Sequence, residues 1–306
     1  MPDLPAIKKN TDIHKVLVVG PNGNVGKVLI PELLKAGYEV RALQYRSPVA
    51  SQKGLDVVQG HTLDVASLEK AMDGVQAVCH LIRATGPGNT PFEQWFNCCV
   101  AGAANLLETS VQAKLKRFIA GSADNVFGHI TIPHHGSLNE NSPKRFADDY
   151  YGLFKIVEEE MCRQYHLGFD LPVVIARFGW VWTDEYVNNV AGTLDRKNKR
   201  IVQRMDLHGK PLVRHDVHVD DAVQGILLSL QKDEAIGQDF NFFSPAPYSS
   251  AALCAVLSSR FGWPVIEQKT DWHSWTVSSE KARSMLGYRP QVDLLEWMRV
   301  RLQREK

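Results

Sequence analysis

The 306-residue sequence has few cysteines, no long apolar run and almost no net charge. Each of these absences argues against one class of protein. Five cysteines, two of them adjacent at Cys98 and Cys99, provide neither a metal-binding spacing nor a disulfide framework. No apolar run approaches a membrane span, and the N-terminal segment lacks a signal peptide's apolar core. A net charge of +1 gives no reason to expect nucleic-acid or anionic-membrane binding. We therefore expect a cytoplasmic globular protein without a metal, nucleic-acid or membrane partner.

What the sequence does contain is a glycine-rich turn, at residues 20–26, between a strand pattern and a helix pattern. Gly20 suits the tight turn out of the strand, Gly23 lets the backbone approach a pyrophosphate, and Gly26 permits close helix packing. The N–H groups of the helix's first turn then favour an anion. The alternative is a turn before a surface helix, but the flanking strand and helix favour a dinucleotide site. Its expected residues are Gly20, Asn22, Gly23, Asn24, Val25 and Gly26.

Strand and helix patterns alternate through residues 16–177, which predicts an α/β fold with a parallel, doubly wound sheet. Sites in such sheets lie beyond the carboxyl ends of the strands, so Gly121 and Ser122, after the fifth strand, are candidates. Residues 179–205 are expected to be irregular. Strands are expected at residues 16–19, 38–43, 55–60, 74–82, 116–120, 172–177 and 239–243. Helices are expected at residues 25–36, 67–72, 91–113, 150–166, 250–260 and 292–303, and directly after residue 217. Ser67 is the expected N-cap of the second helix.

The end of the second strand carries Gln44 where an acidic residue would bind the ribose 2′-hydroxyl of NAD. No carboxylate is present there to repel a 2′-phosphate, and the guanidinium of Arg46 can pair with one. We expect NAD or NADP as cofactor, with a slight preference for NADP. The alternative is that Arg46 is a solvated loop charge.

A Tyr-x-x-x-Lys motif, Tyr151 to Lys155, follows the strand that ends in Gly121 and Ser122. With it, the chain resembles the extended short-chain dehydrogenase/reductase family, in its NAD-dependent epimerase/dehydratase branch, over nearly its whole length. This resemblance implies a Rossmann-type sheet with a smaller C-terminal substrate-binding region. We expect residues 1–177 and 216–243 to form the NAD(P)-binding domain, and residues 178–215 and 244–306 the smaller region. The motifs are the three glycines, Asp64, His80-Leu81, Asn105-Leu-Leu-Glu, Tyr151-x-x-x-Lys155, Arg177, His218-Val-Asp-Asp and Leu286-Gly-Tyr-Arg-Pro.

The chemistry of this family requires a tyrosine and a lysine on one helix face, as Tyr151 and Lys155 would be. A nearby ammonium favours the ionised form of a phenol, which can then take a proton from a substrate hydroxyl during hydride transfer. The resemblance also implies that Lys155 holds the nicotinamide ribose. It places Asp64, Val65 and Leu81 at the cofactor.

The chain departs from the family pattern at several positions, including Cys99, residues 178–184 and the segment that follows the fifth strand. The expected Ser or Thr is Ala123, so either Ser122 polarises the substrate oxygen, or that hydrogen bond is absent or supplied elsewhere. Dehydratases carry an acid pair next, whereas this chain has Asp124 and Asn125. We therefore favour simple redox chemistry over loss of water, and expect Ser122 and Asp124 to contact the substrate.

Trp180 and Arg214 are the remaining candidates for substrate binding. Arg214 lies in a segment resembling the one whose arginine grips the diphosphate of nucleotide sugars, a bidentate role that suits a guanidinium. The alternative for Arg214 is a surface salt bridge. Trp180 either stacks on a sugar or fills the core.

These features predict an NAD(P)-dependent enzyme that transfers hydride at a hydroxyl-bearing carbon of a sugar-like substrate. That substrate is a nucleotide sugar, a free sugar or a sugar acid. The alternative is an NAD(P)-binding sensor or scaffold without turnover, although such a protein needs only the glycine loop. The helices at 91–113 and 150–166 resemble the pair that forms a two-fold interface in relatives, which predicts a homodimer.

Overall fold

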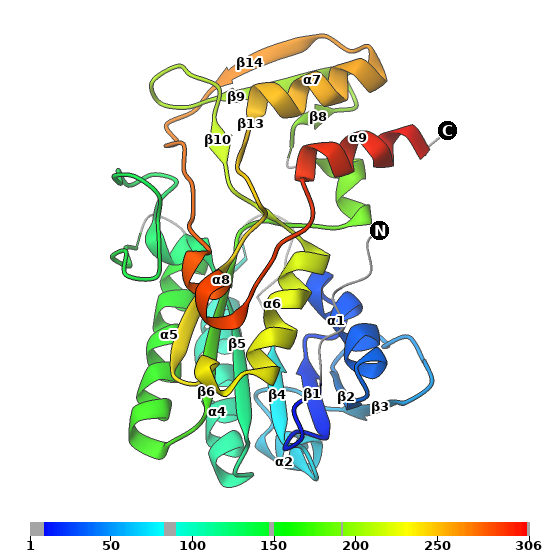
Figure 1. The fold of residues 1–306 in the computed structure, drawn as a ribbon, viewed down its shortest axis with the longest axis vertical. Coiled ribbons are helices and arrows are strands. Elements are labelled where there is room, and N and C mark those ends of the chain that lie inside the picture. The colour runs from blue at the N-terminus through cyan, green and yellow to red at the C-terminus, as the bar shows by residue number, and fades with distance from the viewer. Residues whose placement is uncertain (1–8, 83–89, 147–149, 191, 305–306) are drawn as a thin grey trace.

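The computed structural model describes residues 9–82, 90–146, 150–190 and 192–304. Its largest element is a seven-stranded parallel sheet in the order β12-β6-β5-β4-β1-β2-β3 (Figure 1). The order reverses between β1 and β4, and ligands bind sheets of this type at such a switch point. The strands are β1 (Lys15–Val19), β2 (Glu39–Gln44), β3 (Leu55–Gln59), β4 (Ala77–His80), β5 (Arg117–Ala123), β6 (Val173–Phe178) and β12 (Gln238–Phe242).

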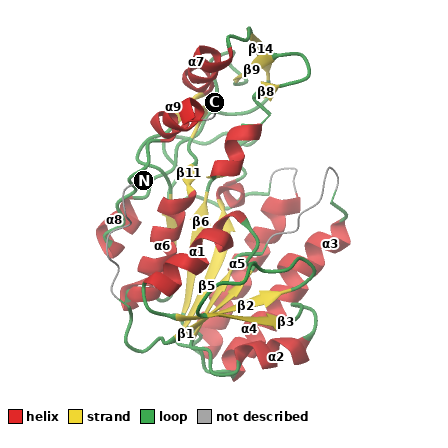
Figure 2. Cartoon of the chain, turned by 90° about the vertical axis from the view of Figure 1, so that its right-hand side faces the viewer, coloured by secondary structure: helices red, strands yellow, loops and turns green. Residues whose placement is uncertain are grey.

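Helices cover both faces of this sheet (Figure 2), which explains the continuous apolar run of β1. Val16, Val18 and Ala42 face one cluster of buried side chains, while Leu17 and Val19 face the other. The first cluster includes side chains of α1 (Asn24–Lys35), α6 (Val219–Gln231) and α8 (Glu280–Leu286), and the second those of α2 (Val65–Met72), α4 (Gly102–Gln112) and α5 (Tyr150–Phe169).

A smaller region stands beyond the carboxyl ends of the strands (Figure 1). Its sheet has the order β14-β9-β8, and helices α7 and α9 pack together beside it around buried Leu257 and Met298. Two short strand pairs, β7 with β11 and β10 with β13, connect the regions. The elements are β7 (Val181–Trp182), β8 (Leu194–Asp195), β9 (Arg200–Met205), β10 (Val213–Arg214), β11 (Val217–His218), β13 (Tyr248–Ser249), α7 (Ser250–Phe261), β14 (Val265–Lys269) and α9 (Leu294–Arg304).

Three expectations need correction. Helix α2 begins at Val65 rather than after Ser67, because the carboxylate of Asp64 is the N-cap and accepts from the N–H of Ser67. The helix expected at 91–113 consists of α3 (Phe92–Phe96), a π-helical turn (Asn97–Ala101) and α4. The segment expected to be irregular contains β9, whose parallel partner β14 lies some sixty residues later.

Candidate active site

A cavity of about 1290 Å³ opens at the carboxyl ends of β1 to β6. Ligand pockets commonly measure roughly 300–1,000 Å³, so this cavity has room for a dinucleotide and a substrate together. The glycine loop after β1, the ends of β4 and β5, and the first turns of α5 all border it. The predicted location of the site, beyond the strand ends, therefore coincides with this cavity.

The glycine loop has the geometry that its sequence predicts. Gly20 has φ +95°, which favours glycine, and it makes the turn between β1 and α1. A Cβ at Gly26 would collide with the carbonyl oxygen of Gly20 and lie 2.9 Å from Cα of Pro21. A Cβ at Gly23 would meet only that carbonyl oxygen, at 3.4 Å, and Gly23 is the N-cap of α1 at the cavity wall. This cradle fits a pyrophosphate, because it leaves the helix N-terminus open to an anion.

The residues that follow β2 and β3 border another part of the cavity. The rings of Tyr45 and His61 lie 4.1 Å apart, and the guanidinium of Arg46 lies 4.9 Å above the Tyr45 ring. Gln44 does not line the cavity, because its amide binds Gln59 and the N–H of Val49. This part of the cavity therefore contains an aromatic pair and one exposed guanidinium. The described lining residues that follow β2 and β3 include no carboxylate.

Tyr151 and Lys155 lie in the first turns of α5, and both line the cavity. The Tyr151 ring packs 5.5 Å from the ring of Trp95, and Tyr151 interacts electrostatically with Lys155. Lys155 is buried, and its ammonium donates to the carbonyl oxygen of Gly121 at 2.8 Å and to Glu158 at 2.8 Å. Although burial alone lowers the pKa of Lys155, Glu158 raises it above its usual range. The ammonium is therefore a fixed positive charge beside the tyrosine.

Ser122 lines the cavity, but its hydroxyl donates to Oε1 of Glu159 at 2.7 Å. Glu159 also accepts two hydrogen bonds from the buried guanidinium of Arg177, at 2.7 and 2.9 Å. Although burial raises it, these partners hold the pKa of Glu159 at about 2. The hydroxyl of Ser122 is thus oriented towards an ionised carboxylate, and its predicted contact with substrate stays a prediction.

Asp124 lines the cavity directly after β5. Burial, together with nearby Asp216, raises the pKa of Asp124 to about 8. Its Oδ2 lies 3.5 Å from Nε2 of His129, and burial lowers the pKa of that histidine to about 3. At neutral pH the pair is therefore a protonated carboxyl beside a neutral imidazole.

The raised pKa of Asp124 makes the stability of the folded protein depend on pH. Asp124 keeps its proton up to about pH 8 in the folded protein but loses it near its ordinary pKa of 3.8 on unfolding. The folded state binds more protons between these values, so the free energy of unfolding falls as pH rises, by up to about 1.4 kcal/mol per pH unit. Asp221, whose pKa burial raises to about 6, and His129 act mainly below pH 7. We expect the Asp124 contribution between pH 7 and 8.

Denaturant unfolding of wild type and Asp124→Asn at these two pH values measures the contribution. The wild type should lose stability between them, and the variant should lose much less. The matched control, exposed Asp271→Asn, should behave as wild type. Equal slopes in wild type and Asp124→Asn would contradict the prediction.

Arg214 is buried between two indole rings, with its guanidinium carbon 5.1 Å from Trp180 and 5.6 Å from Trp275. Its Nη2 donates to Oδ1 of Asp216 at 3.1 Å. Asp216 is fully buried and also accepts from Tyr248 at 2.6 Å. Among the described residues, Nε of Arg214 has no hydrogen-bond partner. Nη2 of the guanidinium is therefore already occupied by Asp216. Arg214, Trp180 and Trp275 all line the cavity, and Trp180 is 53% exposed.

Most of the predicted site residues border this one cavity, and Gln44, Asp64 and Val65 do not. Asp64 instead caps α2, and the prediction that these three contact the cofactor stays untested. His61 and Thr62 also line the cavity and were not predicted, although their position directly after a strand was a usable signal. His129 and Trp275 were likewise not predicted. The lining residues predicted were Gly20, Asn22, Gly23, Asn24, Val25, Gly26, Arg46, Leu81, Ser122, Asp124, Tyr151, Lys155, Trp180 and Arg214.

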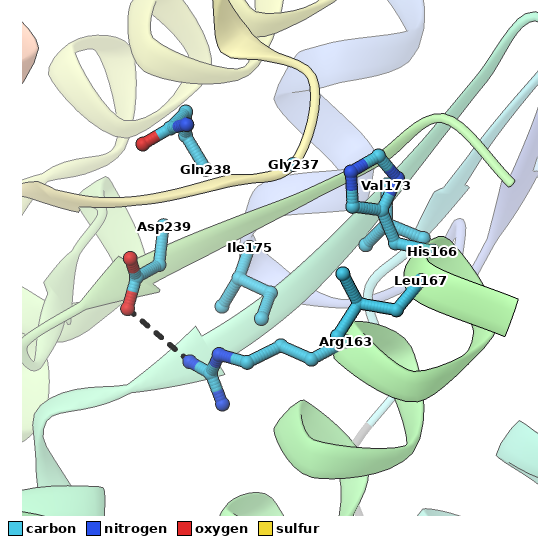
Figure 3. A pocket seen from close by; sticks show the side chains of 8 residues that line it. All are labelled: Arg163, His166, Leu167, Val173, Ile175, Gly237, Gln238 and Asp239. Carbon is cyan, nitrogen blue, oxygen red and sulfur yellow. Dashed lines mark hydrogen bonds and ion pairs between the residues drawn. The ribbon is translucent and has the colours of Figure 1, made fainter. Parts of the chain in front are cut away.

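A second, much smaller cavity of about 130 Å³ lies at the other end of β6 (Figure 3). Arg163 and His166 of α5 face Gly237 and Asp239 across it, and Arg163 forms an ion pair with Asp239 at 3.2 Å. Its volume is below the range of small-molecule pockets. In the described part of the chain, no cluster of His, Cys, Asp or Glu could hold a metal, and no helix is long and apolar enough to cross a bilayer.

Comparison with known proteins supports the same reading of the chain. Residues 16–242 match the model of the NAD dependent epimerase/dehydratase family. The chain is 24% identical to an uncharacterized UDP-glucose epimerase, YtcB, of Bacillus subtilis, over 92% of this chain and 94% of that protein. It is 28% identical to the uronate dehydrogenase of Pseudomonas putida, over 55% of this chain and 62% of that enzyme. Matches to the first curated relatives span from 40% to 94% of the relative's length.

Solved structures share the fold. A short-chain dehydrogenase/reductase superfamily protein from Agrobacterium tumefaciens, solved with bound NAD, aligns with a TM-score of 0.82 at 24% identity. The alignment covers 94% of this chain and 96% of that one. The predicted Rossmann-type, doubly wound sheet is therefore confirmed.

Proposed function

Because the chain belongs to the NAD dependent epimerase/dehydratase family, as its motifs predicted, we propose that it is an NAD(P)-dependent oxidoreductase acting at a hydroxyl-bearing carbon of a sugar-like substrate. The observation that carries this proposal is the shared cavity. Tyr151 and Lys155 border the same space as the glycine loop, although 124 residues lie between Gly26 and Tyr151. A sensor that only binds the cofactor has no need of this pair.

A bound nicotinamide cofactor would supply the hydride acceptor or donor. The N-terminus of α1 and the glycine loop would bind its pyrophosphate. Tyr151 would take the proton of the substrate hydroxyl during oxidation and return it during reduction. Lys155 would stabilise the ionised phenol by its fixed positive charge.

The direct test is to supply NAD or NADP with a panel of free sugars, sugar acids and nucleotide sugars, and to follow the absorbance of the reduced cofactor. Mass spectrometry of the purified protein adds whether a cofactor is retained. Tightly retained cofactor would indicate recycling of the epimerase kind, and easy exchange a dehydrogenase or reductase. Cofactor binding with no turnover across the panel would contradict the proposal and favour the sensor alternative.

For the substrate, the environment of Arg214 favours a free sugar or sugar acid over a nucleotide sugar. A diphosphate calls for a free guanidinium fork, whereas Nη2 of Arg214 already binds Asp216. The buried carboxylate of Asp216 would also repel a diphosphate. The exposed indole of Trp180, which lines the cavity, offers a flat surface for a sugar ring.

A thermal-shift panel in the presence of cofactor separates these classes. Sugar acids or sugars should raise the melting temperature, while UDP and GDP should leave it unchanged. Trp180→Ala should raise KM for the reactive sugar about tenfold with little change in stability, since this side chain is half exposed. Stabilisation by UDP that Arg214→Lys abolishes would overturn the substrate class while leaving the oxidoreductase proposal intact.

Three finer predictions, on cofactor preference, assembly and location, remain proposals. NADP preference would depend on Arg46, which lies exposed at the cavity rim. A homodimer would use α4 and α5, beside which Phe92 and Phe96 are 52% and 42% exposed. A monomeric mass, measured by light scattering at micromolar concentration, would contradict the homodimer. A cytoplasmic location accords with the absence of a membrane-spanning helix among the described residues.

A further inference from the structure

Glu158 is a buried carboxylate that the proposed chemistry does not use. It lies three residues after Lys155 on α5 and is 2% exposed. Its Oε2 is 2.8 Å from Nζ of Lys155, and its Oε1 is 3.2 Å from Nε2 of His80, at the end of β4. The carboxylate therefore lies between two basic side chains, beneath the floor of the cavity.

The other groups that face Lys155 are backbone carbonyls, a phenol and thiols rather than carboxylates. The backbone contributes the carbonyl oxygens of Gly121, at 2.8 Å, and of Ile82, at 3.4 Å. Tyr151 faces it from α5, and the thiols of Cys98 and Cys99 from the π-helical turn. Among the described residues, Glu158 is the carboxylate within ion-pair distance of this ammonium.

Burial opposes the charge on both partners. It lowers the pKa of Lys155 and raises that of Glu158, but the two charges reverse both effects. The pKa of Lys155 lies above its ordinary range and that of Glu158 below it. Removing one charge would leave the other buried without compensation, which strongly disfavours its ionised form.

We propose that Glu158 is the counter-ion that keeps Lys155 protonated, and that it thereby positions the positive charge beside Tyr151. Lys155 stands between the two along the helix, one turn from each. The effect on turnover rests on the proposed oxidoreductase function, whereas the protonation of Lys155 does not. Glu158 is thus a positioning residue, which acts through the lysine.

The neighbouring glutamates of α5 provide a matched control. Glu159 is buried and forms an ion pair with Arg177, and Glu160 is exposed, with 59% of its side chain accessible. Glu158→Gln removes the buried charge at constant shape. Glu160→Gln makes the same chemical change on the same helix without touching Lys155.

The first measurement needs neither cofactor nor substrate. Carbon-13-labelled lysine side chains are titrated by NMR in the free protein, and the Lys155 signal is identified by its loss in Lys155→Met. In wild type and Glu160→Gln this signal should show no titration while the protein stays folded. In Glu158→Gln it should titrate some 3 pH units below the ordinary lysine value. A Lys155 that keeps its proton in Glu158→Gln would overturn the proposal.

The second measurement is the pH profile of turnover. Glu158→Gln should lose at least about tenfold in kcat at alkaline pH, where Lys155 becomes neutral, and Glu158→Asp should restore most of it. An unchanged profile despite an altered lysine titration would overturn the link to Tyr151.

The third measurement covers a Glu158→Gln variant that folds but is too unstable for the titration. The double variant Lys155→Met/Glu158→Gln contains no uncompensated charge, so it should melt at a higher temperature than Glu158→Gln. A double variant that melts no higher would show that Glu158 supports the fold independently of Lys155, and would overturn the proposal.

Discussion

Replacing Tyr151 by phenylalanine should lower turnover at least about a hundredfold and leave cofactor affinity almost unchanged. The change removes only the phenolic oxygen, so the ring can keep its packing against Trp95. Lys155 keeps its contacts with Gly121 and Glu158, so the positive charge stays in place. What is lost is the group that would exchange a proton with the substrate hydroxyl. Steady-state rates and calorimetric titration of NAD(P) measure the two effects separately.

The neighbouring residue supplies a matched control. Tyr150 is 47% exposed and packs its ring 5.4 Å from Phe92. It carries the same phenol on the same helix turn but does not line the cavity. Tyr150→Phe should keep turnover within about twofold of wild type. Turnover in Tyr151→Phe within a few-fold of wild type would remove Tyr151 from the chemistry.

The sheet could be predicted from the sequence because its signals are local. Val16 to Val19 form a continuous apolar run, which a strand covered on both faces requires, and a glycine at φ +95° follows directly. The small sheet could not be predicted in this way. β9 has only six residues, which do not alternate regularly between apolar and polar, and its parallel partner is contributed by a segment far along the chain.

In the site, too, local motifs could be predicted from the sequence, whereas tertiary contacts could not. Tyr151 and Lys155 form a motif with fixed spacing, so the sequence identifies them. Glu158 cannot be separated from Glu160 by sequence, since three consecutive glutamates resemble a solvated helix face. For Arg214 a signal existed, because Asp216 is two residues along an extended chain and therefore on the same side. The burial that makes this pair important depends on Trp180 and Trp275, which only the fold brings together.

Gly23→Val should weaken the binding of both NAD and NADP at least about tenfold without unfolding the protein. The fold should tolerate valine because Gly23 has φ −73° and ψ 166°, which any residue adopts. The added Cβ would meet only the carbonyl oxygen of Gly20, at 3.4 Å. The rest of the side chain would stand at the cavity wall, where it would keep a pyrophosphate away from the N–H groups of α1.

Two further variants make this prediction specific, with affinity measured by calorimetry and folding by circular dichroism. Gly26→Val should instead destabilise the fold itself, because its Cβ would collide with the backbone of Gly20 and Pro21. Arg46→Ala should weaken NADP and leave NAD unchanged, since its guanidinium would contact only the 2′-phosphate. A folded Gly23→Val protein with wild-type affinity would refute the assignment of the glycine loop to the pyrophosphate. A wild type that prefers NAD, and keeps that preference in Arg46→Ala, would refute the role of Arg46 alone, because the pyrophosphate cradle does not depend on it.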